Sequence, residues 1–147
     1  MRFGIVTTLC TGLFAGAATY INLVEHPARM TCGTATALAE WRPSYKRATV
    51  MQASLLIAGV LSAVGAAFTE SRKTGWLYGG LLLASIAPLT LIGMSPTNSQ
   101  LFEPSSEQDL DRVQQLLSRW NRLHAVRSAL SASAFLIFSL SLRPQKP

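Results

Sequence analysis

Charged, metal-binding and cofactor-binding residues are scarce in this sequence. Only 14% of its 147 residues are charged, and it contains two histidines and two cysteines. Two cysteines provide neither a disulfide framework nor a cysteine-rich metal cluster, and no glycine-rich cofactor loop is present. The net charge is +6, but the basic residues form no run with interleaved aromatic residues. We therefore expect no nucleic-acid partner.

Charge is almost missing from four apolar stretches, each about 20 residues long and therefore long enough, as a helix, to cross a hydrocarbon layer of roughly 30 Å. Only His124 and Arg127 place ionisable groups in them. Because lipid offers no hydrogen bonds to a backbone, helices are the expected form. The stretches are Phe3–Val24, Ala48–Phe68, Gly75–Met94 and Leu123–Leu142. They predict an all-α fold, a transmembrane four-helix bundle that forms a single domain over residues 1–147 of an integral, multi-pass membrane protein in contact with the lipid bilayer.

The segments between these stretches predict how the helices are connected. We expect residues 25–47 and 95–122 to be long loops on one face, and Thr69–Thr74 to be a tight turn on the other. Pro27 disfavours a helical conformation at His26 and should end the first helix there. Pro88 should kink the third helix near Ala84. We expect the first helix to be retained rather than cleaved as a signal peptide, because its apolar run is longer than a typical signal core.

The fourth helix is predicted to extend well beyond its apolar stretch. Ser105 and Ser106, followed by Gln108 and Asp109, have the pattern of an N-terminal cap. No glycine or proline follows until Pro144. One long extended helix should therefore run from about residue 106 to residue 142.

One face of this last helix changes from apolar to ionisable where it enters the bilayer. Residues spaced alternately by three and four lie on one helical face; they are Leu110, Val113, Leu117, Trp120, His124, Arg127 and Ser131. His124 and Arg127 thus occupy positions where the pattern requires core residues, and ionisable groups at membrane depth usually face a partner or a wet cavity. Two alternatives stay open: Arg127 extends to the lipid headgroups, and His124 has a purely structural hydrogen bond.

Other polar and aromatic residues are expected at the same end of the bundle. His26 lies one turn after Asn22 at the end of the first helix, and a turn after the third helix presents Asn98. Trp41, Tyr45 and Arg47 precede the second helix, beside Arg42. An interfacial belt of aromatic and basic anchors would explain Trp41 and Arg42, but it does not explain the histidines and Asn98.

Short motifs at these junctions resemble a known family in order along the chain. They are Glu25-His26-Pro27, Trp41 with Tyr45 and Arg47, Pro96-Thr97-Asn98 with Leu101, and Trp120-x-x-x-His124-x-x-Arg127. The set resembles a family of four-helix membrane proteins that includes the anthrone oxygenases. The resemblance implies oxidation of an anthrone to an anthraquinone by dioxygen, without a metal, flavin or haem. The implied partners are a hydrophobic aromatic small molecule and dioxygen.

Such chemistry suggests roles for the candidate residues. A histidine can remove a proton from the acidic methylene of an anthrone, and we expect His124 before His26 to be this base. Arg127 and Asn98 would stabilise the oxyanion that develops. The candidate substrate-binding residues are the aromatic and basic side chains Trp41, Trp120, Tyr45 and Arg47. No metal is expected, although Glu25 with the two histidines is an alternative iron site.

Two other classes of function stay open. The chain could be a non-enzymatic membrane scaffold or small-ligand-binding protein that uses the polar residues to hold its helices together. A transporter is a third reading, although no inverted repeat is visible. A homo-oligomer is a further partner that the sequence leaves open.

Overall fold

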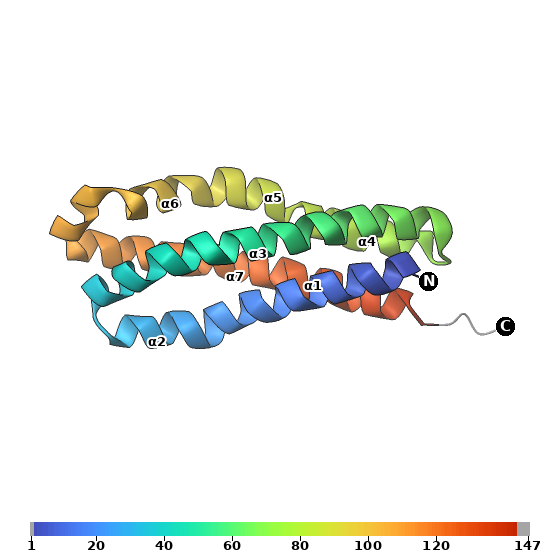
Figure 1. Ribbon diagram of the computed structural model, residues 1–147, viewed down its shortest axis with the longest axis horizontal. Helices are drawn as coiled ribbons and strands as arrows, with labels where there is room; N and C mark the ends of the chain where they lie inside the picture. The colour runs from blue at the N-terminus through green and yellow to red at the C-terminus, as the bar shows by residue number, and fades with distance from the viewer. Residues whose placement is uncertain (1, 144–147) are drawn as a thin grey trace.

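Four long helices pack side by side in an elongated bundle (Figure 1). The structure, a computed structural model, describes residues 2–143. Within them, each of the four helical spans is long and apolar enough to cross a membrane. The spans are Arg2–Thr31, Thr34–Thr69, Lys73–Phe102 and Leu110–Ser141. The prediction of an all-α four-helix bundle is confirmed.

The first and third spans are composite helices. The first contains α1 (Arg2–Tyr20), the π-helical turn η1 (Ile21–Glu25) and α2 (His26–Thr31). The third contains α4 (Lys73–Ala84), α5 (Ile86–Pro88), the π-helical η2 (Leu89–Met94) and α6 (Ser95–Phe102). The second span is the single helix α3 (Thr34–Thr69), and the fourth is α7 (Leu110–Ser141), which follows the 3₁₀ helix η3 (Pro104–Gln108). Both long composite spans thus contain a π-helical segment before their last α-helical turns.

The prediction of a long loop over residues 25–47 is wrong, because this segment is almost entirely helical. Only Cys32 and Gly33 separate α2 from α3, and Gly33 has a φ of +86°, which glycine adopts without a Cβ penalty. The polar start of α3 is helical because Ala37, Leu38 and Trp41 recur at helical spacing and are buried. The connection is therefore a tight turn between two helices.

Two prolines predicted to end helices lie inside helical spans instead. Pro27 follows η1 and Pro96 follows η2, each at the start of a new α-helical segment. A proline ring crowds the carbonyl four residues before it and has no N–H to donate. In both spans that carbonyl belongs to a π-helical segment, where a wider turn separates it from the ring. Consequently His26 does not leave the helix, and Asn98 lies within α6 rather than in a turn.

The other two predictions about connections are confirmed. The turn between α3 and α4 is short, from Glu70 to Arg72, and Arg72 adopts a left-handed conformation with φ of 62°. The third span is interrupted at Ser85, directly after Ala84 and three residues before Pro88. Loss of the Pro88 donor accounts for this break.

Helix α7 is continuous through Trp120, as predicted, but it begins later than predicted. Its N-cap is Asp109, whose carboxylate accepts a hydrogen bond of 3.0 Å from the backbone N–H of Arg112. Ser105 and Ser106 belong to η3 and do not cap it. Asp109 is the better cap because an Asp carboxylate also interacts favourably with the helix dipole. The helix has 32 residues and is about 48 Å long.

The bundle has two buried clusters, one towards each end. The Trp76 cluster consists of Phe14, Ala18, Ala63, Ala66, Ala67, Trp76, Leu83, Ile86, Ala134 and Phe138. It lies towards the end that holds the α3–α4 turn and the N-terminus (Figure 1). The Trp41 cluster consists of Ile21, Ala37, Leu38, Trp41, Met94, Leu101, Val113, Leu116, Leu117 and Trp120. Phe14 and Ala18 bring α1 into the first of these clusters.

Candidate functional site

The predicted inward face of α7 is buried and carries the ionisable residues into the bundle. Val113, Leu117, Trp120, His124, Arg127 and Ser131 are all at most 8% exposed. The prediction is wrong for Leu110, which is 41% exposed in the first turn of α7. The headgroup alternative for Arg127 is also wrong, because its guanidinium lies 4.8 Å from the centre of the Phe14 ring. The sequence periodicity therefore identified an inward-facing His124–Arg127 pair.

His124 is held by an asparagine from the first span. Asn22 donates through Nδ2 to the backbone carbonyl of Asn121 at 3.1 Å and to its Oδ1 at 2.8 Å. A backbone carbonyl can only accept, so the Asn22 amide has one orientation, with Oδ1 towards His124. Oδ1 lies 2.8 Å from His124 Nδ1 and also accepts from the Ser128 hydroxyl. His124 therefore carries its proton on Nδ1, and Nε2 is left unprotonated in the neutral ring.

Arg127 is paired with a glutamine from α3. Its Nη2 donates to Gln52 Oε1, and Gln52 is 2% exposed. The other face of the guanidinium meets the Phe14 ring, a cation–π contact. The structure thus fixes the guanidinium between an amide and an aromatic ring.

A stack of aromatic rings adjoins His124. The Trp120 ring stacks on His124 with centroids 4.7 Å apart, and Trp41 meets Trp120 edge-on at 5.7 Å. Tyr45 stacks on the other side of Trp41 at 4.9 Å. Trp41 is fully buried, so the interpretation of Trp41 as an interfacial anchor is wrong. Arg42 instead joins α3 to α6 and η3 through the carbonyls of Leu101 and Glu103.

A small cavity lies between η1, α2, α3 and α7 and contains many of the candidate residues. It is lined by Ile21, Glu25, Arg29, Trp41, Ser44, Tyr45, Ala48, Thr49, Gln52, Trp120, His124 and Arg127. It leaves about 20 Å³ for the centres of water-sized molecules. A space of this size holds one or two waters, so a three-ring molecule requires side chains to move.

Three predicted site residues lie outside the lining. His26 is 4% exposed and contacts Trp120, with ring centroids 5.7 Å apart. Asn98 is 7% exposed and donates from Nδ2 to the Tyr45 hydroxyl at 2.9 Å. Arg47 is exposed and borders a shallow groove on the outer surface of α3. His26 and Asn98 therefore support lining side chains, whereas Arg47 lies away from the cavity.

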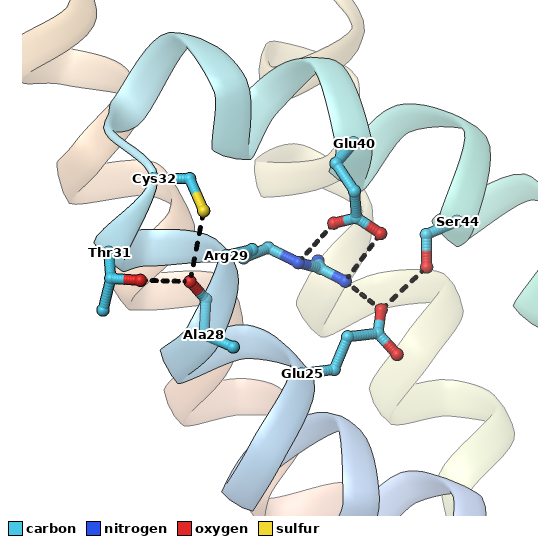
Figure 2. A network of polar contacts seen from close by, with 7 residues as sticks. All are labelled: Glu25, Ala28, Arg29, Thr31, Cys32, Glu40 and Ser44. Atoms are coloured by element: carbon cyan, nitrogen blue, oxygen red, sulfur yellow. Dashed lines mark hydrogen bonds and ion pairs between the residues drawn. The ribbon is translucent and has the colours of Figure 1, made fainter.

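An ion-pair network is centred on the buried Arg29 side chain (Figure 2), and its members Glu25, Arg29 and Ser44 line the cavity. The Arg29 side chain is 5% exposed and forms salt bridges with Glu25 and Glu40, the second with an Nε–Oε2 distance of 2.6 Å. Ser44 donates to the same Glu25 carboxylate at 2.9 Å. The network joins the first span to α3, and the two carboxylates neutralise the Arg29 guanidinium.

Several buried polar atoms around the cavity have no hydrogen-bond partner within the described part of the chain. Five of them belong to lining residues, and one of these, Arg29 Nε, lies 2.6 Å from Glu40 Oε2 as an ion pair. The other four are the indole nitrogens of Trp41 and Trp120, Gln52 Nε2 and Arg127 Nε. All four are hydrogen-bond donors. Buried donors of this kind are costly unless something accepts from them, so the cavity is suited to a molecule with acceptor oxygens.

The alternative iron site is not assembled. Among residues 2–143, no group of three or more His, Cys, Asp or Glu side chains is placed to hold a metal ion. Glu25 is engaged by Arg29 and Ser44, and His124 Nδ1 by Asn22. Glu25 and His124 therefore have other partners, and His26 contacts the Trp120 ring.

Sequence reasoning missed four residues of this site: Asn22, Gln52, Asn121 and Ser128. Gln52 is the one amide in the apolar stretch Ala48–Phe68, and this was the available signal. Asn22 was noted as a neighbour of His26 but not as the partner of His124. The pairings cross between helices and have no signature in a single sequence.

The comparisons with known proteins agree with the architecture and the motifs. A family model described as anthrone oxygenase matches residues 41–137, about two thirds of the chain. An anthrone oxygenase from Cryptosporiopsis sp. (strain 8999), dmxR16, is 28% identical over 130 residues, which cover 84% of this chain and 76% of that protein.

Two further relatives are similar over most of their length. An anthrone oxygenase from Claviceps purpurea (strain 20.1) is 28% identical, covering 85% of this chain and 80% of its own. The anthrone oxygenase tpcL from Aspergillus fumigatus (strain ATCC MYA-4609 / CBS 101355 / FGSC A1100 / Af293) is 29% identical, covering 83% and 82% respectively. No solved structure matches the chain significantly. The matched region contains most of α3, the third span and most of α7, and the chain belongs to the anthrone oxygenase family.

Proposed function

We propose that this protein is a membrane-embedded, cofactor-independent oxygenase that converts an anthrone-like polycyclic phenol into the corresponding quinone. The observation that carries the proposal is the cavity lined by both Arg127 and His124, whose Nδ1 is held by Asn22 so that its Nε2 is free to act as a base. The relatives named above are described as anthrone oxygenases, which supports the substrate class.

The lipid-facing surface supports the proposed location. Large apolar side chains are exposed along the outer faces of the spans, including Leu9, Leu61, Leu81, Leu91 and Leu136. A soluble protein rarely exposes contiguous apolar patches of this extent. An apolar three-ring phenol would also partition into the bilayer and reach the protein from there.

His124 is the base in the proposed reaction. Its Nε2 removes a proton from the methylene between the two aromatic rings, and the resulting carbanion is delocalised onto the carbonyl oxygen. Arg127 stabilises the negative charge on that oxygen within a site that excludes most water. Asn22 accepts from Nδ1–H throughout, so the imidazolium that forms remains hydrogen-bonded.

Dioxygen is the oxidant, and the atoms balance without another reactant. The carbanion transfers electrons to dioxygen and forms a carbon–oxygen bond, and the His124 imidazolium returns its proton to give a hydroperoxide. Removal of the second methylene proton then forms the carbonyl as the O–O bond breaks. Hydroxide leaves and is protonated, so that CH₂ and O₂ become C=O and H₂O.

The test is turnover by the purified protein and its His124→Ala variant. The wild-type protein, incubated with an anthrone in detergent micelles, is expected to consume one dioxygen for each quinone formed, also after treatment with a chelator. General-base catalysis typically contributes about 10²–10⁴-fold, so His124→Ala should lose turnover by about that factor. His26→Ala is the comparison and should lose less, because His26 lies behind Trp120. Thermal unfolding shows whether each variant is folded.

The outcomes separate this proposal from a scaffold. A folded His124→Gln variant retains a hydrogen-bonding side chain but has no base, so full activity in it would contradict the role of His124. Stoichiometric iron, copper or flavin in the active protein would contradict the cofactor-free mechanism. No turnover of any polycyclic phenol by the wild-type protein would favour the scaffold.

A further inference from the structure

Gln52 is a buried amide in an apolar stretch of α3, residues 48–68. It lies in α3, is 2% exposed, and borders the same cavity as His124 and Arg127. A primary amide has one acceptor oxygen and two N–H donors. Burying these groups without hydrogen bonds costs free energy, so an amide at this position requires partners.

Only one side of the Gln52 amide has a partner. Oε1 accepts from Arg127 Nη2, and a guanidinium can only donate, so this contact fixes which end of the amide is oxygen. Nε2 is buried and has no hydrogen-bond partner within the described residues. The Gln52 amide is therefore oriented by Arg127, and the N–H donors of Nε2 are unpaired in a residue that lines the cavity.

The size of the cavity restricts what these donors can bind. About 20 Å³ is available to the centres of water-sized molecules, which is enough for a water or a diatomic molecule but not for an aromatic ring system. The lining combines an acceptor, His124 Nε2, with donors on Arg127 and Gln52. This pattern suits a small molecule whose oxygen atoms accept hydrogen bonds from Arg127 and Gln52 and exchange a proton with His124.

We propose that this cavity is the subsite for dioxygen and the peroxide derived from it, and that Gln52 is a catalytic residue that donates Nε2–H to the distal peroxide oxygen. The inference rests on the proposed function. When the O–O bond of the hydroperoxide breaks, its electron pair goes to the distal oxygen, which departs as hydroxide and takes a proton from the His124 imidazolium. A donor already directed at that oxygen stabilises the negative charge that develops there.

The role differs from the one that the sequence suggested for Asn98. The Asn98 amide donates to the Tyr45 hydroxyl and does not line the cavity. The neutral donor that adjoins Arg127 is Gln52. Asn98 in this arrangement positions Tyr45, and Gln52 contacts the reacting oxygens.

Gln52→Glu is the decisive variant because it separates the donor from the contact with Arg127. A glutamate retains an oxygen for the Arg127 guanidinium but replaces the N–H donors with a second acceptor. If Gln52 only holds Arg127 in place, Gln52→Glu should remain active. If Gln52 donates to the peroxide, the variant should lose activity, and Gln52→Leu should lose it as well.

The experiment measures anthrone consumption, dioxygen consumption, quinone formation and released hydrogen peroxide for each protein. Removing one oxyanion donor typically costs about 10²–10³-fold in kcat, so we expect kcat for quinone formation to fall by about that factor with little change in KM. We also expect peroxide to accumulate, with less than one quinone per dioxygen. Gln115→Glu makes the same chemical change at an exposed position of α7 and should behave like the wild-type protein.

The results distinguish the inference from the proposed function on which it rests. A folded Gln52→Glu variant with wild-type kcat and one quinone per dioxygen would overturn the role of Gln52 while leaving the oxygenase intact. A wild-type protein that consumes no dioxygen with any anthrone would overturn both. A lower kcat with peroxide release in Gln52→Glu, and neither effect in Gln115→Glu, would establish Gln52 as the donor to the peroxide.

Discussion

Replacing Asn22 with leucine should reduce turnover, because the ring proton of His124 would no longer be held on Nδ1. The Asn22 amide oxygen accepts from His124 Nδ1–H at 2.8 Å and from the Ser128 hydroxyl. In Asn22→Leu the Nδ1–H of His124 loses its acceptor, whereas the Ser128 hydroxyl can still donate to the backbone carbonyl of His124 at 3.1 Å. The imidazole proton is then free to move to Nε2. A ring protonated at Nε2 cannot act there as a base.

The magnitude follows from the strength of the lost hydrogen bond. Leaving a buried donor unsatisfied costs about 1–3 kcal/mol, and 1–2 kcal/mol changes the ratio of two states by a factor of about 5–30. We therefore expect kcat to fall by about 5–30-fold, less than in His124→Ala. Asn121→Ala is the matched comparison, because Asn22 Nδ2 retains the backbone carbonyl of residue 121 at 3.1 Å. One neutral hydrogen bond contributes about 0.5–1.5 kcal/mol, and 1.4 kcal/mol corresponds to about tenfold. Because Asn22 Nδ2 keeps its second acceptor, Asn121→Ala should reduce kcat by the lower end of that range, about twofold to threefold.

Two measurements test this reasoning independently. Turnover of an anthrone gives kcat, and ¹⁵N NMR of histidine-labelled protein reports which ring nitrogen carries the proton. His124→Gln assigns the resonances, because only two histidines are present. The reasoning is refuted if Asn22→Leu retains the Nδ1–H tautomer, or if the tautomer changes while kcat does not.

Two further predictions concern the guanidinium and the helix packing. Arg127→Lys should lower kcat about 10–100-fold, because an ammonium cannot reproduce the planar contacts with Gln52 and Phe14. The magnitude follows from the charge-assisted hydrogen bond that is lost, which contributes about 1.5–3 kcal/mol. An Arg127→Lys variant with the kcat of the wild-type protein would contradict this prediction. Gly79→Ala should destabilise the bundle by about 1–3 kcal/mol, measured by thermal unfolding in detergent, because the new Cβ would lie 2.5 Å from the Phe138 ring. Gly16→Ala, with no atom within 4 Å of its Cβ, is the control and should not destabilise it.

The length and apolar character of the spans could be predicted because both are local properties of the sequence. The inward placement of His124 and Arg127 followed from the three–four spacing along α7, which one long uninterrupted helix preserves over many turns. Val113, Leu117 and Trp120 on the same face are buried as that spacing requires. Leu110 deviates because it occupies the first helical turn, where η3 and the cap precede it.

The segments predicted as loops are helical because polarity alone does not end a helix. The start of α3 contains charged residues but also Ala37, Leu38 and Trp41 on one buried face. A period of three to four in a polar segment outside the apolar stretch was the signal that was not used. The segments at Pro27 and Pro96 were predicted not to be helical for a different reason. Each proline follows a π-helical segment, and no residue pattern in the sequence indicates these segments.

The site could be predicted only in part, because its pairings depend on how the helices are rotated against each other. The sequence indicated that ionisable residues gather at one end, but it could not pair Asn22 with His124 or Gln52 with Arg127. These contacts join residues 102 and 75 positions apart. Local periodicity identifies which face is inward and leaves the partner across the interface undetermined.

The π-helical turn η1 holds one residue more than an α-helical turn would, because His26 bonds to the carbonyl of Ile21, five residues earlier. Deleting one residue from η1 other than Asn22 would let this turn become α-helical without rotating the residues on either side of it. Deleting a residue from α1 instead would rotate the two ends of the span against each other by about 100° about the helix axis, and His26 and Arg29 could not keep their contacts together with the residues of α1. The first span should therefore tolerate a single-residue deletion in η1 better than one in α1.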